Sequence, residues 1–357
     1  MSGTNKALLP TSRLLQPIMS TSSSNTLTLV LSADDAYAQP LAVTVYSALV
    51  HLTPGWTVDL YVIDGGISEA NRTRIARVVE AAPPSTTLRW LTPDSNQVHN
   101  LPVLDDRMST SAYLRLCLPD LLPDTCERVL YLDSDVLVTS SLTPLWTEPF
   151  DGTALCAVQD YYTPYVSSTR GLDYYRELDL APHTPYFNSG VMAINLAHWR
   201  EHSVGVAALQ HIEAYQDRVI FQDQGGLNAV VAGNWTPLDP AWNLFVTPDR
   251  LKDVPPSEVQ ETLTARPQLF QTAHIYHFAG GVKPWALDTY HLMQRRWYQY
   301  LWQSAWHTTQ ERWASIAAFG PVHAWRWFSH TVRGRTRPMR HRMAPHLPGP
   351  VGSLLRR

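Results

Sequence analysis

Apolar, β-prone runs alternate with helical patterns over the first 132 residues, and this alternation restricts the fold more than any other feature of the chain. The first run, Leu27–Ala33, is uniform enough for a strand that is buried on both faces. After it, Leu41, Val45 and Leu49 recur at helical spacing until the Pro-Gly pair at 54–55 ends the helix. Strands and helices that alternate in this way predict a mostly parallel sheet with helices on its faces.

The same reasoning extends to the rest of the chain. Further strands are expected at Val58–Ile63, Thr87–Leu91, Val129–Leu132, Ala154–Gln159, Tyr186–Asn195 and Ile275–Phe278. Helices are expected after Ser68 and over Thr110–Leu118, Ala197–Tyr215 and Asp223–Val231, with loops over Tyr161–Leu180 and Ala241–Gln271. Ligands of parallel sheets bind beyond the carboxyl ends of the strands. Because the early strands end in or close to acidic residues, we expect a binding site at that edge.

The composition is that of a globular protein, with 45% hydrophobic and 17% charged residues among 357. We divide the chain into a mobile, Ser/Thr-rich tail over residues 1–25, an α/β domain over 26–300 and a basic, aromatic segment over 301–357. Charge is unevenly distributed: nine arginines and no acidic residue occur from Arg312 onward, while residues 1–311 carry a net charge of −12. A basic end on an acidic body suggests an anionic surface as partner.

Neither the apolar runs nor the cysteines point to secretion or membrane insertion. No run approaches the ~18–20 apolar residues that span a bilayer, and the N-terminus lacks the apolar core of a signal peptide. The three cysteines, Cys117, Cys126 and Cys156, cannot all pair and match no metal or redox spacing. We expect reduced thiols and a cytoplasmic protein.

The sharpest local motif is Arg128–Asp135, in which an apolar strand leads into Asp133, Ser134 and Asp135. Alternation along an extended strand places the two aspartates on one side, where both carboxylates can bind one hard cation. Such a cation would neutralise the diphosphate of a nucleotide-sugar and stabilise it as a leaving group. A turn whose aspartates bond the backbone is the plain alternative. The apolar runs on both sides favour metal binding.

A second motif runs from His277 through Gly280 and Gly281 to Lys283. An imidazole suits Mn²⁺-like ions beside two carboxylates, although a lone histidine on an apolar strand is more often a core residue. The glycines let backbone N–H groups approach a phosphate, and Lys283 adds a positive charge. The motif predicts a lid over a diphosphate; a glycine-rich turn before Pro284 is the alternative.

A third motif, FQDQGG, opens a helix with Asp223 and Gln224. Asp223 can cap the helix or offset its dipole, or it can hold sugar hydroxyls. Gln224 is uncharged and therefore a poor nucleophile, but its dipole can support a developing oxocarbenium ion.

Seven segments in consistent order, from about Leu27 to Trp285, resemble the retaining glycosyltransferases of family 8, and within it the bacterial lipopolysaccharide and lipooligosaccharide galactosyl- and glucosyltransferases. These segments are LSADDAYAQPL, YVIDGGISEANR, STSAYLRLCLPDLLP, RVLYLDSDVLVTSSLTPLW, YFNSGVMAINLAHWR, FQDQGGLN and HFAGGVKPW. The resemblance implies a GT-A fold, a UDP-sugar donor carrying Gal or Glc, a Mn²⁺ or Mg²⁺ cofactor, and retention of the anomeric configuration.

The resemblance also implies roles by position. Asp133, Asp135 and His277 become the metal ligands. Asp34 and Tyr37 match the uridine contacts of the family, and Ser32 lies beside them at the strand end. The residues that match those facing the donor sugar are Arg115, Asp160, Asn188, Ser189, Asp223 and Gln224. Gly280 and Lys283 match the phosphate lid, and Ser134 and Gly281 are also placed at the donor. Gln224 stands at the family's position for a nucleophile, which with Asp223 makes these two the candidate catalytic residues. Ala36 and the Gly225-Gly226 pair depart from the family pattern, at the ribose contact and on the acceptor side respectively.

Two other functions compete with this one. A haloacid-dehalogenase-like phosphohydrolase also has a DxD after an apolar strand, but its nucleophilic aspartate usually follows the first strand of the chain, whereas Asp133 follows several. A catalytically inactive nucleotide-sugar-binding protein would keep the same motifs.

The C-terminal segment is interpreted as a membrane-docking surface. Five of the thirteen tryptophans lie there, at 302, 306, 313, 325 and 327, and Arg333–Arg342 holds five arginines. Aromatic rings suit the headgroup level of a bilayer, and arginines suit anionic lipids. We expect a peripheral protein on the inner face of the membrane, near a glycolipid or glycan acceptor. A disordered tail is the alternative, and a nucleic-acid partner is not expected.

Overall fold

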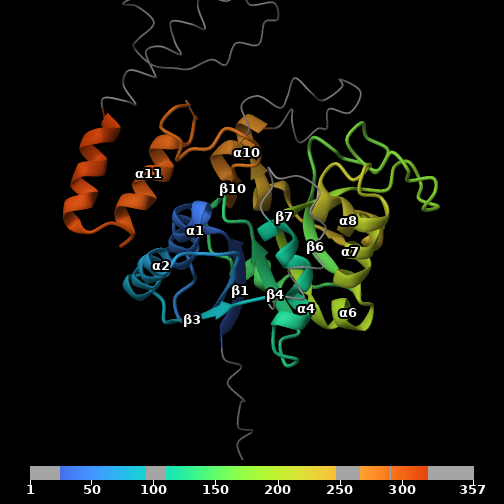
Figure 1. Cartoon of the computed structure of the whole chain (residues 1–357), viewed down its shortest axis with the longest axis horizontal. Helices are drawn as coiled ribbons and strands as arrows, with labels where there is room; N and C mark the ends of the chain where they lie inside the picture. The colour runs from blue at the N-terminus through green and yellow to red at the C-terminus, as the bar shows by residue number, and fades with distance from the viewer. Residues whose placement is uncertain (1–24, 94–109, 247–265, 290, 321–357) are drawn as a thin grey trace, which may run out of the picture.

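The computed structural model describes residues 25–93, 110–246, 266–289 and 291–320 (Figure 1). Its centre is a seven-stranded sheet with the order β3-β2-β1-β4-β7-β6-β8. The strands are β1 (Thr26–Ala33), β2 (Thr57–Asp64), β3 (Thr86–Leu91), β4 (Arg128–Leu132), β6 (Leu155–Gln159), β7 (Phe187–Asn195) and β8 (Thr236–Pro237). The first four run parallel to one another, while β7 is antiparallel to both of its neighbours. The predicted mostly parallel sheet is confirmed.

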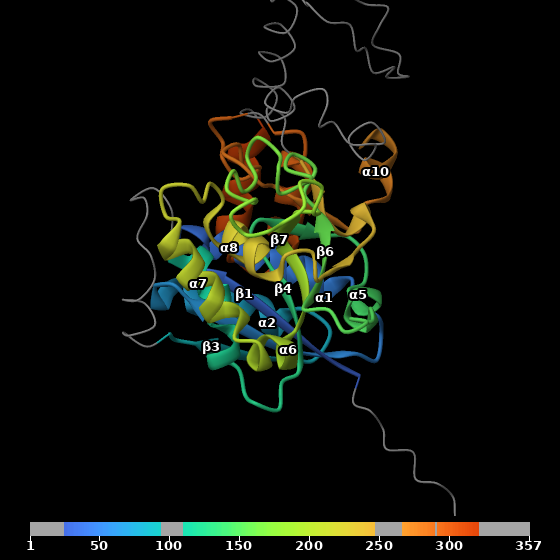
Figure 2. The same ribbon diagram turned by 90° about the vertical axis from the view of Figure 1, so that its right-hand side faces the viewer.

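Helices cover both faces of this sheet (Figures 1 and 2). On one face lie α1 (Ala38–Val50) and α2 (Glu69–Ala81); on the other lie η2 (Thr110–Cys117), α4 (Leu118–Leu121), α6 (Leu196–Glu201), α7 (Val204–Ala214) and α8 (Gln222–Val231). Strand β1 shows why both faces are covered. Leu29 and Leu31 belong to the core under α1, whereas Val30 belongs to the core under η2 and α7. The uninterrupted apolar run predicted this double burial.

A second, three-stranded sheet with the order β5-β10-β9 closes over the carboxyl end of β4. It consists of β5 (Val136–Val138), β9 (Leu244–Phe245) and β10 (Ile275–His277). The prediction that 241–271 is all loop is therefore wrong, because η3 (Pro240–Asn243) and α10 (Arg266–Thr272) overlap this range and β9 lies within it. Strands as short as β9 have no alternating pattern, and they form because β10 supplies the partner for their backbone groups.

Two predicted helices differ in detail. The segment at Thr110–Cys117 is a 3₁₀ helix rather than an α-helix. The long helix expected over Ala197–Tyr215 is broken at Ser203, which has a left-handed φ of 51°. The break redirects the chain so that Gly205 lies against η2, where an added Cβ would stand 2.0 Å from the Leu116 carbonyl oxygen. This contact is between distant parts of the sequence, so helical periodicity could not reveal it.

Beyond residue 293, α11 (Gln294–Gln303) and a further helix at 309–320 pack against the domain. Leu301, Trp306 and Phe319 are buried in the same core as α1. Trp313 is 63% exposed. No helix within the described ranges is long and apolar enough to cross a bilayer. The tail at 1–24 and the arginine-rich residues 321–357 lie outside the described residues.

Candidate active site

The two aspartates of the DxD motif lie on a turn at the carboxyl end of β4. Strand β4 ends at Leu132 and β5 begins at Val136, so the strand alternation invoked from the sequence does not apply. The turn is instead fixed by its backbone: Asp133 N–H donates to the Gly190 carbonyl (2.8 Å), and Phe278 N–H donates to the Asp135 carbonyl (2.9 Å). The carboxylates still converge, because neighbouring strands hold both ends of the turn.

His277 completes a cluster of three potential ligands. Strand β10 pairs with β5 so that His277 lies opposite Val136, the residue after the motif. Its Nε2 is 3.4 Å from Asp135 Oδ1 and 3.7 Å from Asp133 Oδ2. One ligand atom from each of the three residues lies within 4.8 Å of the others. Two carboxylate oxygens and one imidazole nitrogen are ligands that suit Mn²⁺ and, less specifically, Mg²⁺.

Gly190, in the middle of β7, allows this cluster to form. A Cβ at this position would stand 2.4 Å from His277 Cε1 and 2.7 Å from Asp133 Oδ2. Both distances are far below van der Waals contact, so any side chain at this position would displace the His277 and Asp133 side chains. A glycine inside a strand often marks such a close approach. This signal is present within the predicted strand Tyr186–Asn195, although no role was predicted for Gly190.

Two cations balance the two aspartates. Lys283 Nζ lies 2.5 Å from Asp135 Oδ2 and also donates to the Phe278 carbonyl at 2.8 Å. Arg115, only 5% exposed, pairs with Asp133 (2.7 Å) and with Asp223 (3.2 Å). Burial alone would raise the pKa of Asp135, but the ammonium group of Lys283 outweighs it and holds that pKa well below the ordinary range. The carboxylate is therefore ionised at any physiological pH.

Beyond Arg115, a chain of buried amides connects the cluster to the start of α8. Gln224 Oε1 accepts from Asn188 Nδ2 (2.8 Å) and from Ser189 N–H (3.2 Å). Gln224 Nε2 donates to Asp160 Oδ2 (3.2 Å), and Asp160 Oδ1 accepts two backbone N–H groups, from Tyr162 and Thr163. Burial raises the pKa of Asp160, and these hydrogen bonds offset part of that increase.

Asp223 does not cap α8. The N-cap of that helix has no side-chain hydrogen bond. The Asp223 carboxylate instead pairs with Arg115 and accepts from Ser189 Oγ at 3.1 Å. Burial raises its pKa, and Arg115 counteracts the effect. The residues predicted to face a donor sugar, Arg115, Asp160, Asn188, Ser189, Asp223 and Gln224, are thus joined in one hydrogen-bonded group.

The residues predicted around a nucleoside lie at the end of β1. Asp34 caps η1 (Asp35–Tyr37) by accepting from Tyr37 N–H at 3.1 Å. The Tyr37 ring meets the Trp285 ring edge-on, 5.7 Å between centroids, with Lys283 Nζ 5.8 Å from the Tyr37 centroid. Ser134 Oγ donates to the Ser32 carbonyl (2.6 Å), and Ser32 Oγ lies 2.9 Å from Tyr131 Oη. These serine hydroxyls join the ends of β1 and β4.

The comparisons with known proteins decide the family. The profile of glycosyl transferase family 8 matches residues 28–289. The chain belongs to this family. It is 31% identical over 292 residues to general stress protein A of Bacillus subtilis (strain 168), covering 78% of this chain and 94% of that protein. It is 28% identical to glycosyltransferase GlyF of Streptococcus pneumoniae serotype 4, covering 76% of this chain and 60% of that protein.

Solved structures of glycosyltransferases also match this chain. The galactosyltransferase LgtC in complex with donor and acceptor sugar analogs matches with a TM-score of 0.66 and 29% identity, over 80% of this chain and 99% of that one. The bifunctional glycosyltransferase WbbM matches in fold, with a TM-score of 0.65 at 23% identity, over 82% of this chain and 52% of that one. The family 8 chain therefore has the GT-A-like α/β fold and the general activity of glycosyl transfer. The phosphohydrolase alternative is wrong.

The lid motif of this family 8 chain is a turn after β10. Gly280 has a φ of +106°, a conformation that favours glycine. A Cβ added at Gly281 would meet nothing within 4 Å. The turn brings Lys283 back to Asp135, next to the cluster of three potential metal ligands. The predicted lid residues therefore lie together with the predicted metal ligands.

One residue of the site was missed in the sequence. Asn243 ends η3, is fully buried, and lies between two predicted residues: its Oδ1 accepts from His277 Nδ1 (2.9 Å), and its Nδ2 donates to Asn188 Oδ1 (2.9 Å). It lies in the proline-punctuated stretch assigned to loop, where no periodicity marks a buried amide. Only the pairing of β9 with β10 brings it beside His277.

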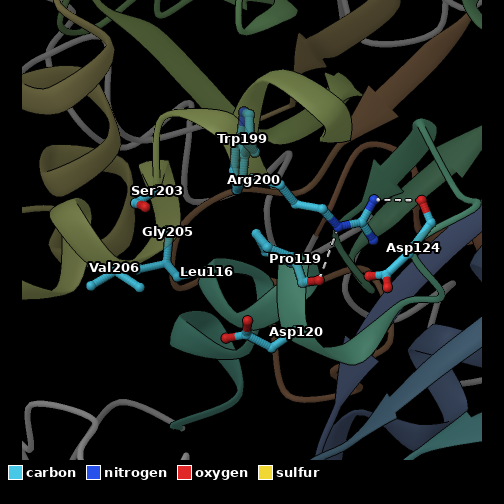
Figure 3. A pocket seen from close by; sticks show the side chains of 9 residues that line it. All are labelled: Leu116, Pro119, Asp120, Asp124, Trp199, Arg200, Ser203, Gly205 and Val206. Atoms are coloured by element: carbon cyan, nitrogen blue, oxygen red, sulfur yellow. Dashed lines mark hydrogen bonds between the residues drawn. The ribbon is translucent and has the colours of Figure 1, made fainter.

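A separate pocket of about 230 Å³ lies between α4 and the start of α7 (Figure 3). It is at the opposite end of the sheet from Asp133 and Asp135. Its lining includes Asp120, Asp124, Arg200 and the half-exposed Val206. Arg200 is fully engaged there by backbone carbonyls, among them those of Pro119 and Asp124. The pocket contains none of the residues of the family 8 site.

Proposed function

We propose that this chain is a retaining, metal-dependent hexosyltransferase that moves Gal or Glc from a UDP-sugar to a hydroxyl of a lipopolysaccharide-type glycan or glycolipid. One observation carries the proposal: Asp133, Asp135 and His277 offer three ligand atoms within 4.8 Å, and Lys283 and Arg115 stand beside them. Three metal ligands flanked by two cations suit a diphosphate, whose charge must be balanced as it leaves.

Each part of the site has a task in this reaction. Bound between the three ligands, Mn²⁺ or Mg²⁺ would supply positive charge to the departing diphosphate. Lys283 and the N–H groups around Gly280 and Gly281 hold the same phosphates from the lid. Asp34 and Tyr37, with Ser32 and Ser134 beside them, hold the nucleoside at the end of β1. Arg115, Asp160, Asn188 and Ser189 surround the sugar.

Retention is assigned to front-face attack. Gln224 is uncharged, and its Oε1 already accepts two hydrogen bonds, so it is poorly suited to attack the anomeric carbon. The Asp223 carboxylate is committed to Arg115 and Ser189. In the proposed reaction the acceptor oxygen forms its bond to the anomeric carbon on the face that the diphosphate leaves. A phosphate oxygen takes the acceptor proton, and the Gln224 dipole supports the developing positive charge.

The proposed location of the enzyme is the inner face of the membrane, which it contacts through the C-terminal segment. Trp313 is exposed on the last described helix, and the sequence contains nine arginines between residues 312 and 357. Arginines near an anionic bilayer contribute about 1 kcal/mol each. Full-length protein should sediment with anionic vesicles at low salt, and less so as salt rises. Protein lacking residues 320–357 should stay in the supernatant; equal sedimentation of both forms would exclude this role for the segment.

The activity itself is tested by UDP release. Purified protein is incubated with Mn²⁺ and either UDP-Gal or UDP-Glc, with and without acceptor glycan, and the anomeric configuration of the product is determined by NMR. Release of UDP from one of the two donors, abolished by EDTA, is the expected result. An inactive nucleotide-sugar-binding protein would bind UDP-sugar in calorimetry and release none.

A further inference from the structure

Two buried side chains, Asn243 and Asn188, lie behind His277 and are connected to it in series by hydrogen bonds. His277, Asn243 and Asn188 are 3%, 0% and 7% exposed. His277 Nδ1 meets Asn243 Oδ1 at 2.9 Å, and Asn243 Nδ2 meets Asn188 Oδ1 at 2.9 Å. This series of hydrogen bonds ends at the backbone, since Gly190 N–H donates to Asn188 Oδ1 at 3.0 Å. Water cannot replace these partners without opening the core.

The backbone fixes the direction of every hydrogen bond in this series. Only an oxygen can accept from Gly190 N–H, so that atom of Asn188 is Oδ1. The group of Asn243 that faces this oxygen must then be its NH₂, which leaves Asn243 Oδ1 facing His277. An oxygen there requires a proton on His277 Nδ1. The lone pair of a neutral imidazole is consequently on Nε2, the nitrogen that faces Asp133 and Asp135.

We infer that Asn243 is a positioning residue that holds His277 in its metal-binding tautomer, with Gly190 N–H setting the polarity through Asn188. The inference rests on the proposed function, because it concerns the same metal cluster. Partners of this kind behind a ligating histidine fix the ring and typically change metal affinity 10–100-fold when removed. Gly190 thus acts twice: its missing side chain makes room for the ligands, and its N–H orients one of them.

The two hydrogen bonds of Asn243 can be separated by substitution. Asn243→Leu has a similar volume and removes both bonds. Asn243→Asp keeps an acceptor for His277 Nδ1–H but loses the donor to Asn188. As a matched control, Asn228→Leu removes another buried amide, whose bonds go to the Phe187 backbone and to the Gln224 carbonyl and not to His277. Circular dichroism and thermal melting establish that each variant is folded.

The measurement is Mn²⁺ binding in the presence of UDP, followed by electron paramagnetic resonance. Titration gives the affinity, and pulsed spectra report modulation from a coordinated imidazole nitrogen. Wild type should show this modulation. Asn243→Leu should lose it and bind Mn²⁺ about 10–100-fold more weakly. Asn243→Asp should keep the modulation and most of the affinity, while its transfer rate falls because Asn188 loses a partner. Asn228→Leu should match wild type in both metal readouts.

The outcomes separate this inference from the function on which it rests. If wild type shows the nitrogen modulation and Asn243→Leu keeps both the modulation and the affinity, the positioning role is wrong while the metal site stands. If Asn228→Leu weakens Mn²⁺ binding as much as Asn243→Leu does, the effect is general loosening and the inference is overturned. If wild type binds no Mn²⁺, or binds it without the modulation, the ligand set of the proposed function fails and the inference fails with it.

Discussion

The site has two polar halves, which we call the metal side (Asp133, Asp135, His277 and Lys283) and the sugar side (Asp160, Asn188, Ser189, Asp223 and Gln224). Both are at least partly buried, but they are stabilised in different ways. On the metal side, full charges are balanced by full charges, as in the pairs Asp135–Lys283 and Asp133–Arg115. On the sugar side, the Asp160 carboxylate is balanced by hydrogen bonds from Gln224, Asn188 and two backbone N–H groups, while Asp223 pairs with Arg115, the cation that the two sides share. Charge pairs tolerate small shifts in position, whereas hydrogen bonds do not.

This difference suits the two tasks of the proposed reaction, which are to balance the charge of the diphosphate and to recognise the sugar. In the proposed reaction a diphosphate and its cation bring large charges that leave with every turnover, and the long, rotatable side chain of a lysine such as Lys283 suits such a changing charge. A hexose is neutral, and its recognition depends on the direction of each hydroxyl. Rigid amides whose polarity is fixed by backbone N–H groups, as at Ser189 and Gly190, are suited to that recognition. Substitutions on the metal side should therefore act through charge, and those on the sugar side through geometry.

The largest effect is expected on the metal side. Removing the metal with EDTA, or changing Asp135 to Ala, should reduce transfer about a thousandfold or more, because several kcal/mol of charge balance at the diphosphate are lost. UDP release measured with saturating donor tests this. Asp120→Ala, an exposed aspartate at the opposite end of the sheet, is the control and should retain activity. Undiminished transfer in EDTA would show that the metal side does not work through a cation.

Gly190→Ala tests whether the metal side also has a strict geometric requirement. The added Cβ would stand 2.4 Å from His277 Cε1 and 2.7 Å from Asp133 Oδ2, so both ligands must move. We expect Mn²⁺ affinity to fall and transfer to drop about a hundredfold, equivalent to about 2.7 kcal/mol. Gly320→Ala is the matched control, because a Cβ there meets nothing within 4 Å. If calorimetry finds the Mn²⁺ affinity of Gly190→Ala unchanged, the cluster does not need this close approach.

Gln224→Ala is the corresponding test on the sugar side. It leaves Asn188 Nδ2 and Asp160 Oδ2 each without one hydrogen bond, at a cost of about 1–3 kcal/mol. Transfer should slow by roughly tenfold to a hundredfold without being abolished, with Mn²⁺ affinity preserved. Steady-state rates and Mn²⁺ titration check both parts. Mass spectrometry of the Gln224→Ala protein incubated with donor should find no sugar on Asp223; a glycosylated Asp223 would replace front-face attack with a covalent mechanism.

The sequence predicted the two sides unequally. The central strands and the three candidate metal ligands were recognisable, because apolar runs and charged pairs are local signals. The reason given for the convergence of Asp133 and Asp135 was wrong, since it assumed an extended strand where a turn occurs. Asn243 and the break at Ser203 were missed because each depends on a contact with a distant segment, β10 in one case and η2 in the other. Local patterns carry no information about such contacts.

The smallest expected effect is the response of the sugar side to acid. Burial raises the pKa of Asp160 and of Asp223 above the ordinary aspartate value. As pH falls, these carboxylates take up protons earlier than exposed aspartates, and the protonated Asp160 is a weaker acceptor for Gln224 Nε2. Because the folded state binds these protons more tightly than the unfolded chain, stability from these two groups is not lost in that window. Asp135, with its lowered pKa, loses its contribution only at more acidic pH.

Transfer should therefore decline several-fold on the acid side before circular dichroism detects unfolding, and it should recover on return to neutral pH. Rates and ellipticity measured across the same pH series test this. Asp160→Asn cannot titrate at that position. Its transfer rate should be low at every pH, but it should fall less on the acid side than the wild-type rate does. If activity and ellipticity fall together, or if Asp160→Asn keeps the wild-type profile, the acid limb does not come from the sugar side, and the contrast between a charge-balanced and a hydrogen-bonded half would have to be abandoned.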